Sequence, residues 1–253
     1  MSQETATTNG EFSEVIGLRN ISQSYNDGED LIIKDLNLSI VNKPNQGQFV
    51  VVLGPSGCGK STILRYIAGL QDPTSGEVLI NGKPRVNEPV SMVFQQYSSL
   101  PWMSVLQNVM LPLTLKGTHK KEAKEKAMEM IKVVGLEGHE GKYAQYPLLS
   151  GGQLQRVAIA RSLISNPNII LMDEPFGALD TNTRTRMQLM LAKIWLQYQS
   201  TIIFVTHDIS EAVFLADDIY IMGGSPAKII EIIHVDLPLE RPIDIKHLSL
   251  IHI

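Results

Sequence analysis

The stretch of the chain best suited to do chemistry is "LGPSGCGKST" at residues 53–62, which overlaps the end of the apolar run 49–53. It fits the pattern Gly-x-x-x-x-Gly-Lys-Ser and stands between a predicted buried strand and a predicted helix. Glycines leave consecutive backbone N–H groups free to turn toward a phosphate, and a helix N-terminus adds a partial positive charge. The sequence therefore predicts a phosphate-binding loop that consists of Gly54, Pro55, Ser56, Gly57, Cys58, Gly59, Lys60, Ser61 and Thr62.

Three polar residues at the end of this loop have predicted roles toward a nucleotide. Lys60 would reach the β- and γ-phosphates, Ser61 would offer its hydroxyl to Mg²⁺, and Thr62 would donate to a phosphate. A plain strand-to-helix turn is the alternative, and the strand and helix on either side disfavour it. The loop by itself indicates only a nucleotide, because kinases, GTPases, motors and transport ATPases all share it.

A pair of acids ends a second apolar run, "NIILMDEP". Asp173 suits the Mg²⁺ shell of a nucleotide, and Glu174 could polarise the water that attacks the γ-phosphate. A small-molecule kinase needs no such acid, because its acceptor is a substrate hydroxyl. The pair alone could be an ordinary turn or helix start, but with the phosphate loop upstream it favours ATP hydrolysis.

The stretch "LLSGGQLQRVAIARSL" predicts a second anion-binding cup. Ser150, Gly151, Gly152 and Gln153 stand at the start of a predicted helix, where backbone N–H groups bind anions. One phosphate loop does not need two cups, whereas two copies placed head to tail do. This stretch resembles the signature motif of the ATP-binding-cassette (ABC) family, and the resemblance covers about residues 15–238 with all motifs in family order.

The resemblance implies roles for further residues of this chain. Tyr25 matches the aromatic side chain that stacks on adenine. Gln95 matches the glutamine that contacts Mg²⁺ and the attacking water, with Gln96 as the alternative register. Asp180, in "GALD", would lie in the loop that crosses the dimer interface, and His207, in "FVTHD", would bond the γ-phosphate. Together with Glu174, Gln95 and His207 form the implied catalytic set, and Gln95 joins Ser61 and Asp173 around the metal.

The resemblance also implies the fold class, which is α/β: a P-loop NTPase (RecA-like) core with an antiparallel β lobe and an inserted α-helical lobe. The sequence itself shows a strand–helix alternation that stops near residue 96 and resumes near 164. We therefore expect a flexible lead at residues 1–14 and an ABC ATPase domain at 15–253. Its core would span about 15–95 and 164–240, and its helical lobe about 96–163.

Composition narrows the class of protein. The 253 residues carry a net charge of −4, which disfavours a nucleic-acid binder. The single cysteine, Cys58, excludes an internal disulfide and indicates a reducing compartment. Residues 1–14 lack the pattern of a signal peptide, and no apolar run reaches the roughly 18 residues that span a bilayer. A protein of this kind that works at a membrane needs a partner to supply the membrane part.

The resemblance implies what those partners are. It predicts a homodimer, or a pair with a related ATPase subunit, bound to transmembrane permease subunits on the cytoplasmic side of the cell membrane, with a solute-binding protein in the same complex. The stretch "QYSSLPWMSVLQNVMLPL" and the later "VDLPLERP" resemble the importer ATPases for nitrate, sulfonate and taurine. Four residues would then line the groove that receives the permease: Tyr97, Leu100, Trp102 and Met103.

Three alternatives stay open from the sequence. Trp102 could simply pack inside the helical lobe. The chain could serve an exporter or a lipid-handling transporter. It could also be a soluble ABC protein of DNA repair or translation, although it carries neither a long coiled-coil insert nor two tandem cassettes. The transported solute is not identified by these residues.

Overall fold

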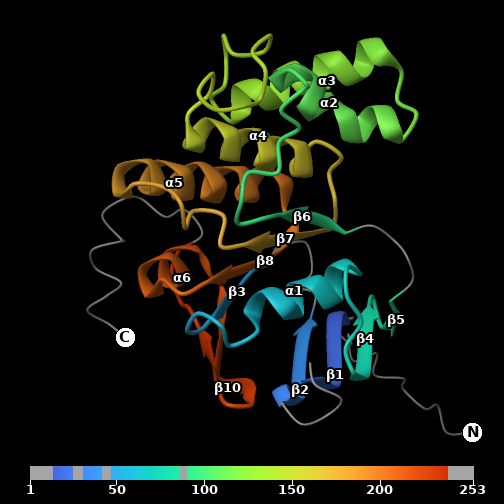
Figure 1. Cartoon of the computed structure of the whole chain (residues 1–253), viewed down its shortest axis with the longest axis vertical. Helices are drawn as coiled ribbons and strands as arrows, with labels where there is room; N and C mark the ends of the chain where they lie inside the picture. Colours follow the sequence, from blue (N-terminus) through green and yellow to red (C-terminus); the bar gives the residue numbers. More distant parts are fainter. Residues whose placement is uncertain (1–13, 25–30, 42–46, 86–89, 239–253) are drawn as a thin grey trace, which may run out of the picture.

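The described part of the chain is built around one ten-stranded sheet with helices on both faces (Figure 1). The computed structural model describes residues 14–24, 31–41, 47–85 and 90–238. The strand order is β5-β4-β1-β2-β10-β9-β3-β8-β7-β6. Strand β1 (Glu14–Ser24) begins at the last residue of the predicted N-terminal lead. The predicted division into lead, core and helical lobe stays a prediction.

Parallel strands form the half of the sheet that carries the chemistry. They are β3 (Phe49–Leu53), β6 (Ser91–Val93), β7 (Ile169–Asp173) and β8 (Thr201–Thr206), and they pair in the order β3-β8-β7-β6. Phe49 and Val51 pack into one hydrophobic cluster and Val50 and Val52 into another, so β3 is buried on both faces. This double burial explains why its sequence is continuously apolar, as predicted.

Different helices cover the two faces of these strands. Helix α1 (Lys60–Ala68) packs its buried face, which includes Ile63, Leu64 and Ile67, into the cluster that contains Val50 and Val52. Helices α5 (Thr181–Tyr198) and α6 (Ile209–Leu215) pack into the cluster on the other face. Ligands of α/β sheets bind at the carboxyl ends of such strands.

The other half of the sheet is mainly antiparallel. Strand β1 pairs with β2 (Leu31–Val41) and with β4 (Ser75–Ile80), which pairs with β5 (Lys83–Pro84). Along β2, Leu36, Leu38 and Ile40 are buried and the residues between them are exposed, as the alternation predicted. The hairpin of β9 (Asp218–Gly224) and β10 (Ala227–His234) joins this half to β3, so the expected β lobe is continuous with the core.

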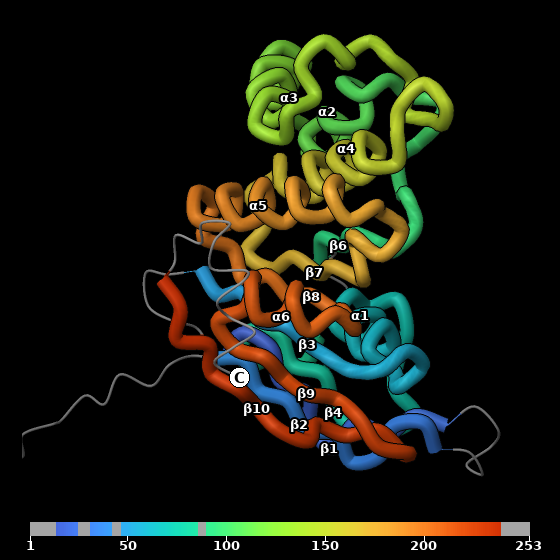
Figure 2. The backbone as a smooth tube through the Cα atoms, turned by 90° about the vertical axis from the view of Figure 1, so that its left-hand side faces the viewer, coloured from blue at the N-terminus to red at the C-terminus, as the bar shows by residue number. Residues whose placement is uncertain are grey.

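The predicted helical block stands above the parallel strands (Figure 1). It contains α2 (Val105–Leu115), α3 (Lys120–Val133) and α4 (Gly151–Leu163), which pack on one another. Ala123, Ala127 and Ile131 form the buried face of α3, as their spacing predicted. Helix α4 also contacts α5 and β6, so it connects the block to the core (Figure 2).

Within residues 14–24, 31–41, 47–85 and 90–238, no helix is both long and hydrophobic enough to span a membrane.

Candidate nucleotide-binding site

The phosphate loop lies between β3 and α1, at the carboxyl end of the parallel strands. Gly59 is the N-cap of α1 and has a φ of 95°, a conformation that residues with a side chain rarely adopt. Helices α2 to α6 each begin with a side chain that accepts a hydrogen bond from the first turn, but α1 does not. The first-turn N–H groups of α1 therefore stay available to an anion.

Lys60 is held at the centre of this loop. It is only 4% exposed, and its Nζ donates to the carbonyl oxygens of Gly54 and Pro55 at 2.9 Å each. The same Nζ lies 3.6 Å from Glu174 Oε1. The predicted phosphate-binding cation and the predicted catalytic carboxylate are thus within ion-pair distance.

Ser61 and Asp173 form a pair of oxygen atoms beside the loop. Ser61 Oγ donates to Asp173 Oδ1 at 2.7 Å, and Asp173 is buried at the end of β7. Burial raises the pKa of Asp173, and the hydrogen bond from Ser61 acts in the opposite direction.

This oxygen pair fits Mg²⁺, which prefers oxygen ligands and keeps several of them from water or phosphate. Within the described residues, no group of three or more histidine, cysteine, aspartate or glutamate side chains could hold a metal. The protein ligands of a magnesium site would be Ser61 and Asp173 together with Gln95, whose predicted role toward the metal stays a prediction, and the nucleotide and water would supply the remaining ligands.

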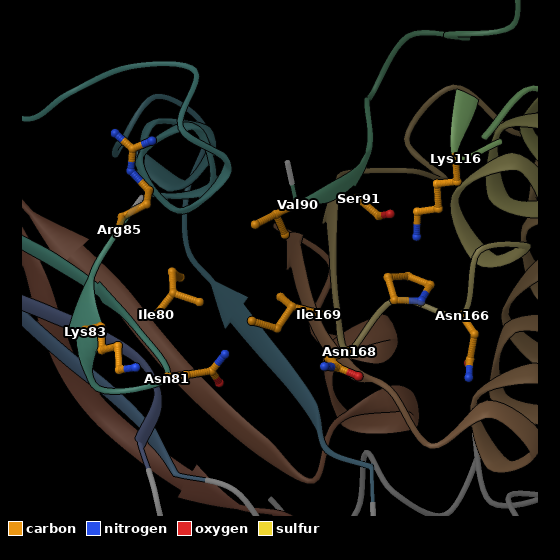
Figure 3. A pocket seen from close by; sticks show the side chains of 11 residues that line it. Ile80, Asn81, Lys83, Arg85, Val90, Ser91, Lys116, Asn166, Asn168 and Ile169 are labelled. Atoms are coloured by element: carbon orange, nitrogen blue, oxygen red, sulfur yellow. The ribbon is translucent and has the colours of Figure 1, made fainter. Parts of the chain in front are cut away.

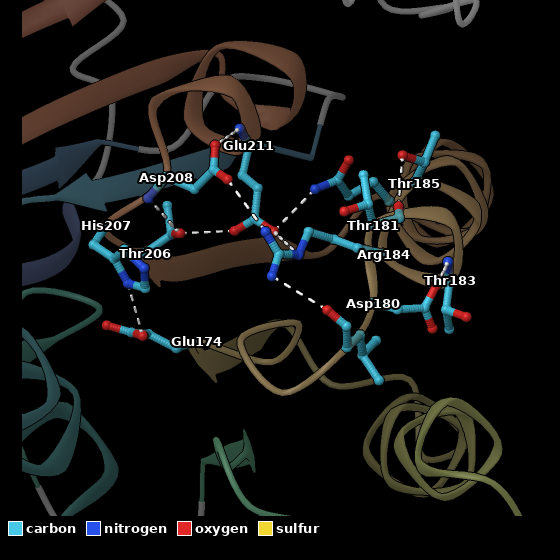
Figure 4. Close-up of polar contacts among 12 residues, drawn as sticks. Glu174, Asp180, Thr181, Thr183, Arg184, Thr185, Thr206, His207, Asp208 and Glu211 are labelled. Carbon is cyan, nitrogen blue, oxygen red and sulfur yellow. Dashed lines mark hydrogen bonds and ion pairs between the residues drawn. The ribbon is translucent and has the colours of Figure 1, made fainter.

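Glu174 connects the phosphate loop with His207. Its Oε2 lies 3.0 Å from His207 Nδ1 (Figure 4), and its other carboxylate oxygen, Oε1, is the one that lies near Lys60. The backbone of Glu174 has a φ of 42°, which is uncommon for a residue with a side chain, and its N–H donates to the Val205 carbonyl at 3.0 Å. The fold holds this carboxylate in an unfavourable backbone conformation, which is a feature of functional sites.

Gln95 lies two residues beyond the end of β6 and close to the same carboxylate. A Cβ atom placed on Gly177 would be 3.9 Å from Gln95 Nε2 and 3.8 Å from Glu174 Oε2, so both side chains lie beside this glycine. The three predicted catalytic residues, Gln95, Glu174 and His207, thus follow three neighbouring parallel strands.

The signature residues lie elsewhere in the chain. Ser150 caps α4: its Oγ accepts from the Gln153 N–H at 3.3 Å, while Gln153 Oε1 accepts from the Ser150 N–H at 2.9 Å. A Cβ on Gly151 would be 2.2 Å from Tyr97 Oη, so a larger residue at position 151 would displace the Tyr97 side chain. Helices α4 and α1 lie on opposite sides of β6 and β7 (Figures 1 and 2). One chain does not bring its two predicted cups together.

Two further predicted residues have different outcomes. Asp180 is exposed and caps α5, because its Oδ1 accepts from the Thr183 N–H at 3.0 Å; hydrogen bonds from the side chain and the backbone N–H of Thr183 lower its pKa. Tyr25 lies outside the described residues, so its predicted stacking on adenine stays a prediction.

A cavity of about 550 Å³ lies at the other end of the parallel strands (Figure 3). Its wall includes Ser91 and Ile169, which are the first residues of β6 and β7, together with Ile80 and Lys116. The residues of the nucleotide site follow the last residues of these strands. This cavity is therefore separate from the nucleotide site.

Comparison with known proteins agrees with this geometry. The profile of the family described as "ABC transporter" matches residues 33–177, which is more than half of the chain. The chain belongs to the ABC transporter family. It is an ATPase and the ATP-binding subunit of an ABC transporter.

Two curated relatives and one solved structure show the extent of the similarity. An aliphatic sulfonates import ATP-binding protein of Bacillus cereus is 44% identical over 83% of this chain and 81% of its own length. A nitrate import ATP-binding protein of Synechocystis is 46% identical over 83% of this chain and 78% of its own length. A dimeric ATP-binding cassette bound to ADP and phosphate has a TM-score of 0.73 and 34% identity over 88% of this chain and 100% of its own.

Sequence reasoning missed residues that stand behind the site. Glu211, Arg184 and Thr206 form a polar cluster next to His207 (Figure 4). The signal that could have found Glu211 is a glutamate inside the otherwise apolar helix "ISEAVFL". A charge in such a helix is buried at a cost unless it has partners.

Proposed function

We propose that this chain is the ATP-hydrolysing subunit of a membrane importer for small anions or organic solutes of the nitrate and sulfonate kind. The observation that carries the hydrolytic part is the placement of Glu174 between Lys60 and His207, 3.6 Å from one and 3.0 Å from the other. The importer part is supported by the similarity to nitrate and sulfonate import proteins.

The residues perform hydrolysis as follows. The N–H groups of α1 and Lys60 bind the phosphates of ATP, His207 bonds the γ-phosphate, and Gln95 orients a water molecule in line with the γ-phosphorus. Glu174 accepts a proton from that water as its oxygen bonds to phosphorus. The bond to the bridging oxygen breaks, which releases ADP and phosphate. Mg²⁺ held at Ser61 and Asp173 would neutralise charge on the phosphate oxygens.

A second subunit completes the site in this proposal. Helix α4 lies away from α1 within one chain, so Ser150, Gly151, Gly152 and Gln153 would serve the nucleotide of the partner. The partner is a second copy or a related ATPase subunit, and Asp180 lies in the loop that crosses between them. The dimeric relative with bound ADP and phosphate supports this arrangement.

The proposed permease contact is a set of exposed aromatic side chains on the helical block. Trp102 is 71% exposed, which disfavours the alternative in which it packs inside the block. Segment 97–103 lies beside a second exposed aromatic segment, because the Ala144 N–H donates to the Met103 carbonyl at 3.0 Å. In that segment Tyr143 and Tyr146 are exposed as well. A permease on this surface would place the chain on the cytoplasmic face of the membrane, and a solute-binding protein would deliver the cargo.

Glu174→Gln tests the hydrolytic part. The variant keeps the shape of the side chain but cannot accept the proton of the water, so we expect it to bind ATP and to hydrolyse it about 10² to 10⁴ times more slowly. Because ATP then persists at the interface, a dimer should accumulate in size-exclusion chromatography with ATP. A monomer with the wild-type rate would exclude Glu174 as the base.

Transport assays test the importer part. Vesicles that contain this subunit with the permease that co-purifies with it should take up labelled nitrate or an alkyl sulfonate when ATP is present. ATP-driven efflux would instead favour an exporter. A subunit that hydrolyses ATP but associates with no membrane protein in the cell would favour a soluble ABC protein.

A further inference from the structure

A buried glutamate outside the predicted site is tied to the strand that carries His207. Glu211 is only 4% exposed; its Oε2 accepts from Thr206 Oγ1 at 2.7 Å and its Oε1 accepts from Gln188 Nε2 at 2.9 Å (Figure 4). Arg184 Nε lies 3.8 Å from the same Oε1. Removing a carboxylate from water to this extent costs free energy, and the hydrogen bonds of Glu211 and the nearby Arg184 cation offset that cost.

The first arm of this cluster fixes both neighbours of His207. Thr206 Oγ1 donates to Glu211 and also accepts from the Asp208 N–H at 3.0 Å. Asp208 Oδ1 in turn accepts from the Glu211 N–H at 3.1 Å. His207 stands between Thr206 and Asp208, so its backbone is held on both sides by groups that Glu211 binds.

The second arm reaches the loop that carries Asp180. Arg184 Nη2 donates to the Leu179 carbonyl at 3.3 Å, and the backbone N–H of Arg184 donates to the Asp180 carbonyl at 2.8 Å. Arg184 Nη1 lies 3.5 Å from Asp208 Oδ2. One guanidinium therefore connects the Leu179–Asp180 loop with the residue that follows His207.

We propose that Glu211 is a positioning residue for ATP hydrolysis, which holds His207 through Thr206 and Asp208 and connects it through Arg184 to the loop of Asp180. The inference rests on the proposed hydrolytic roles of His207 and Glu174. Glu211 does not contact the nucleotide in this proposal. It sets the distance between His207 and Glu174 and keeps the histidine in register with the loop that faces the partner subunit.

Glu211→Gln combined with His207→Ala tests this role. The glutamine keeps the volume but loses the charge and one acceptor, so His207 shifts and kcat should fall about 10- to 100-fold, because small misplacements have effects of that size. The KM for ATP should stay near the wild-type value, since Lys60 and α1 are untouched. In the His207→Ala background the same substitution should have no further effect on kcat, because the group it positions is absent.

Matched controls separate positioning from folding. Asp218→Asn changes another buried carboxylate, which accepts from Gln48 Nε2 at 2.7 Å at the far end of β3, and should leave kcat unchanged. If Glu211→Gln does not fold, Thr206→Val removes the same contact and Thr206→Ser should restore kcat.

Two outcomes overturn the inference. Equal falls in kcat with and without His207 would show that Glu211 does not act through the histidine, while leaving the proposed function intact. A His207→Ala variant with wild-type kcat would overturn both the inference and the proposed role of His207.

Discussion

The two glycine-rich helix starts of this chain are built differently. At α1 the N-cap is Gly59, and no side chain binds the first-turn N–H groups. At α4 the N-cap is Ser150, and a reciprocal pair of hydrogen bonds with Gln153 closes the first turn. The first turn of α1 therefore offers free N–H donors to an anion, whereas in the first turn of α4 the Gln153 N–H is already bonded to Ser150.

From this difference we infer unequal roles for the two cups. Free N–H groups and Lys60 let the α1 cup bind phosphate within one chain. At the α4 cup the Gln153 N–H already donates to Ser150 Oγ at 3.3 Å, so a phosphate oxygen would compete with this bond. We therefore expect the α1 cup to supply affinity and the α4 cup to close on nucleotide that is already bound.

Among the substitutions that test this difference between the cups, Lys60→Ala should have the largest effect, which is a loss of affinity for ATP. It removes the cation of the α1 cup, and a lost charge-assisted contact with phosphate of about 3 kcal/mol corresponds to a roughly 100-fold weaker affinity for ATP. Isothermal titration with ATP and Mg²⁺ measures it. Lys126→Ala, which removes an exposed lysine paired with Glu122, is the control that should bind normally. Unchanged affinity in Lys60→Ala would count against the phosphate loop.

Ser150→Ala should have a smaller effect and a different one. We expect ATP affinity to stay unchanged and kcat to fall about 10-fold, the loss for one hydrogen bond to a charged group. Ser104→Ala is a matched control, because Ser104 caps α2 through the same reciprocal pair with Gln107. Both variants should lose about 1 kcal/mol of folding stability with the cap, but only Ser150→Ala should lose activity. A weaker affinity for ATP in Ser150→Ala would contradict the proposal that the α1 cup supplies the affinity and the α4 cup closes on bound nucleotide.

Cys58 offers the mildest test, because it lies in the α1 cup and the α4 cup has no thiol. It is 9% exposed, with its Sγ 4.0 Å from the Met222 carbonyl, so alkylation should be slow. Bound ATP should slow it further, and the alkylated protein should lose activity because the added group enters the phosphate loop. Mass spectrometry follows the modification, and a fully alkylated protein with full activity would contradict the placement.

The parts of the site that could be predicted are those encoded by local spacing. The loop before Lys60 and the start of α4 are continuous in the chain, so their glycines and capping residues are visible in the sequence. The buried strands were predicted for the same reason, because β3 and β7 are short apolar runs that end at glycine or acid. Asp173 and Glu174 followed directly from the end of one of these runs.

The parts that could not be predicted depend on packing between distant segments. Arg184, Thr206 and Glu211 meet only because α5, β8 and α6 come together in the fold, and no local pattern shows which partners a buried glutamate will have. The pairing of segment 97–103 with residues 143–146 is of the same kind. The open apolar surface they share depends on that pairing.

The contact between Tyr97 and Gly151 has a mechanical consequence. The phenol hydroxyl occupies the space where any side chain at position 151 would stand, so the backbone beside Ser150 rests directly on the segment that follows Gln95. A displacement of that segment would therefore move the Tyr97 ring against the start of α4. In the proposed transporter, this contact would couple a movement of the permease-facing segment to the position of Ser150.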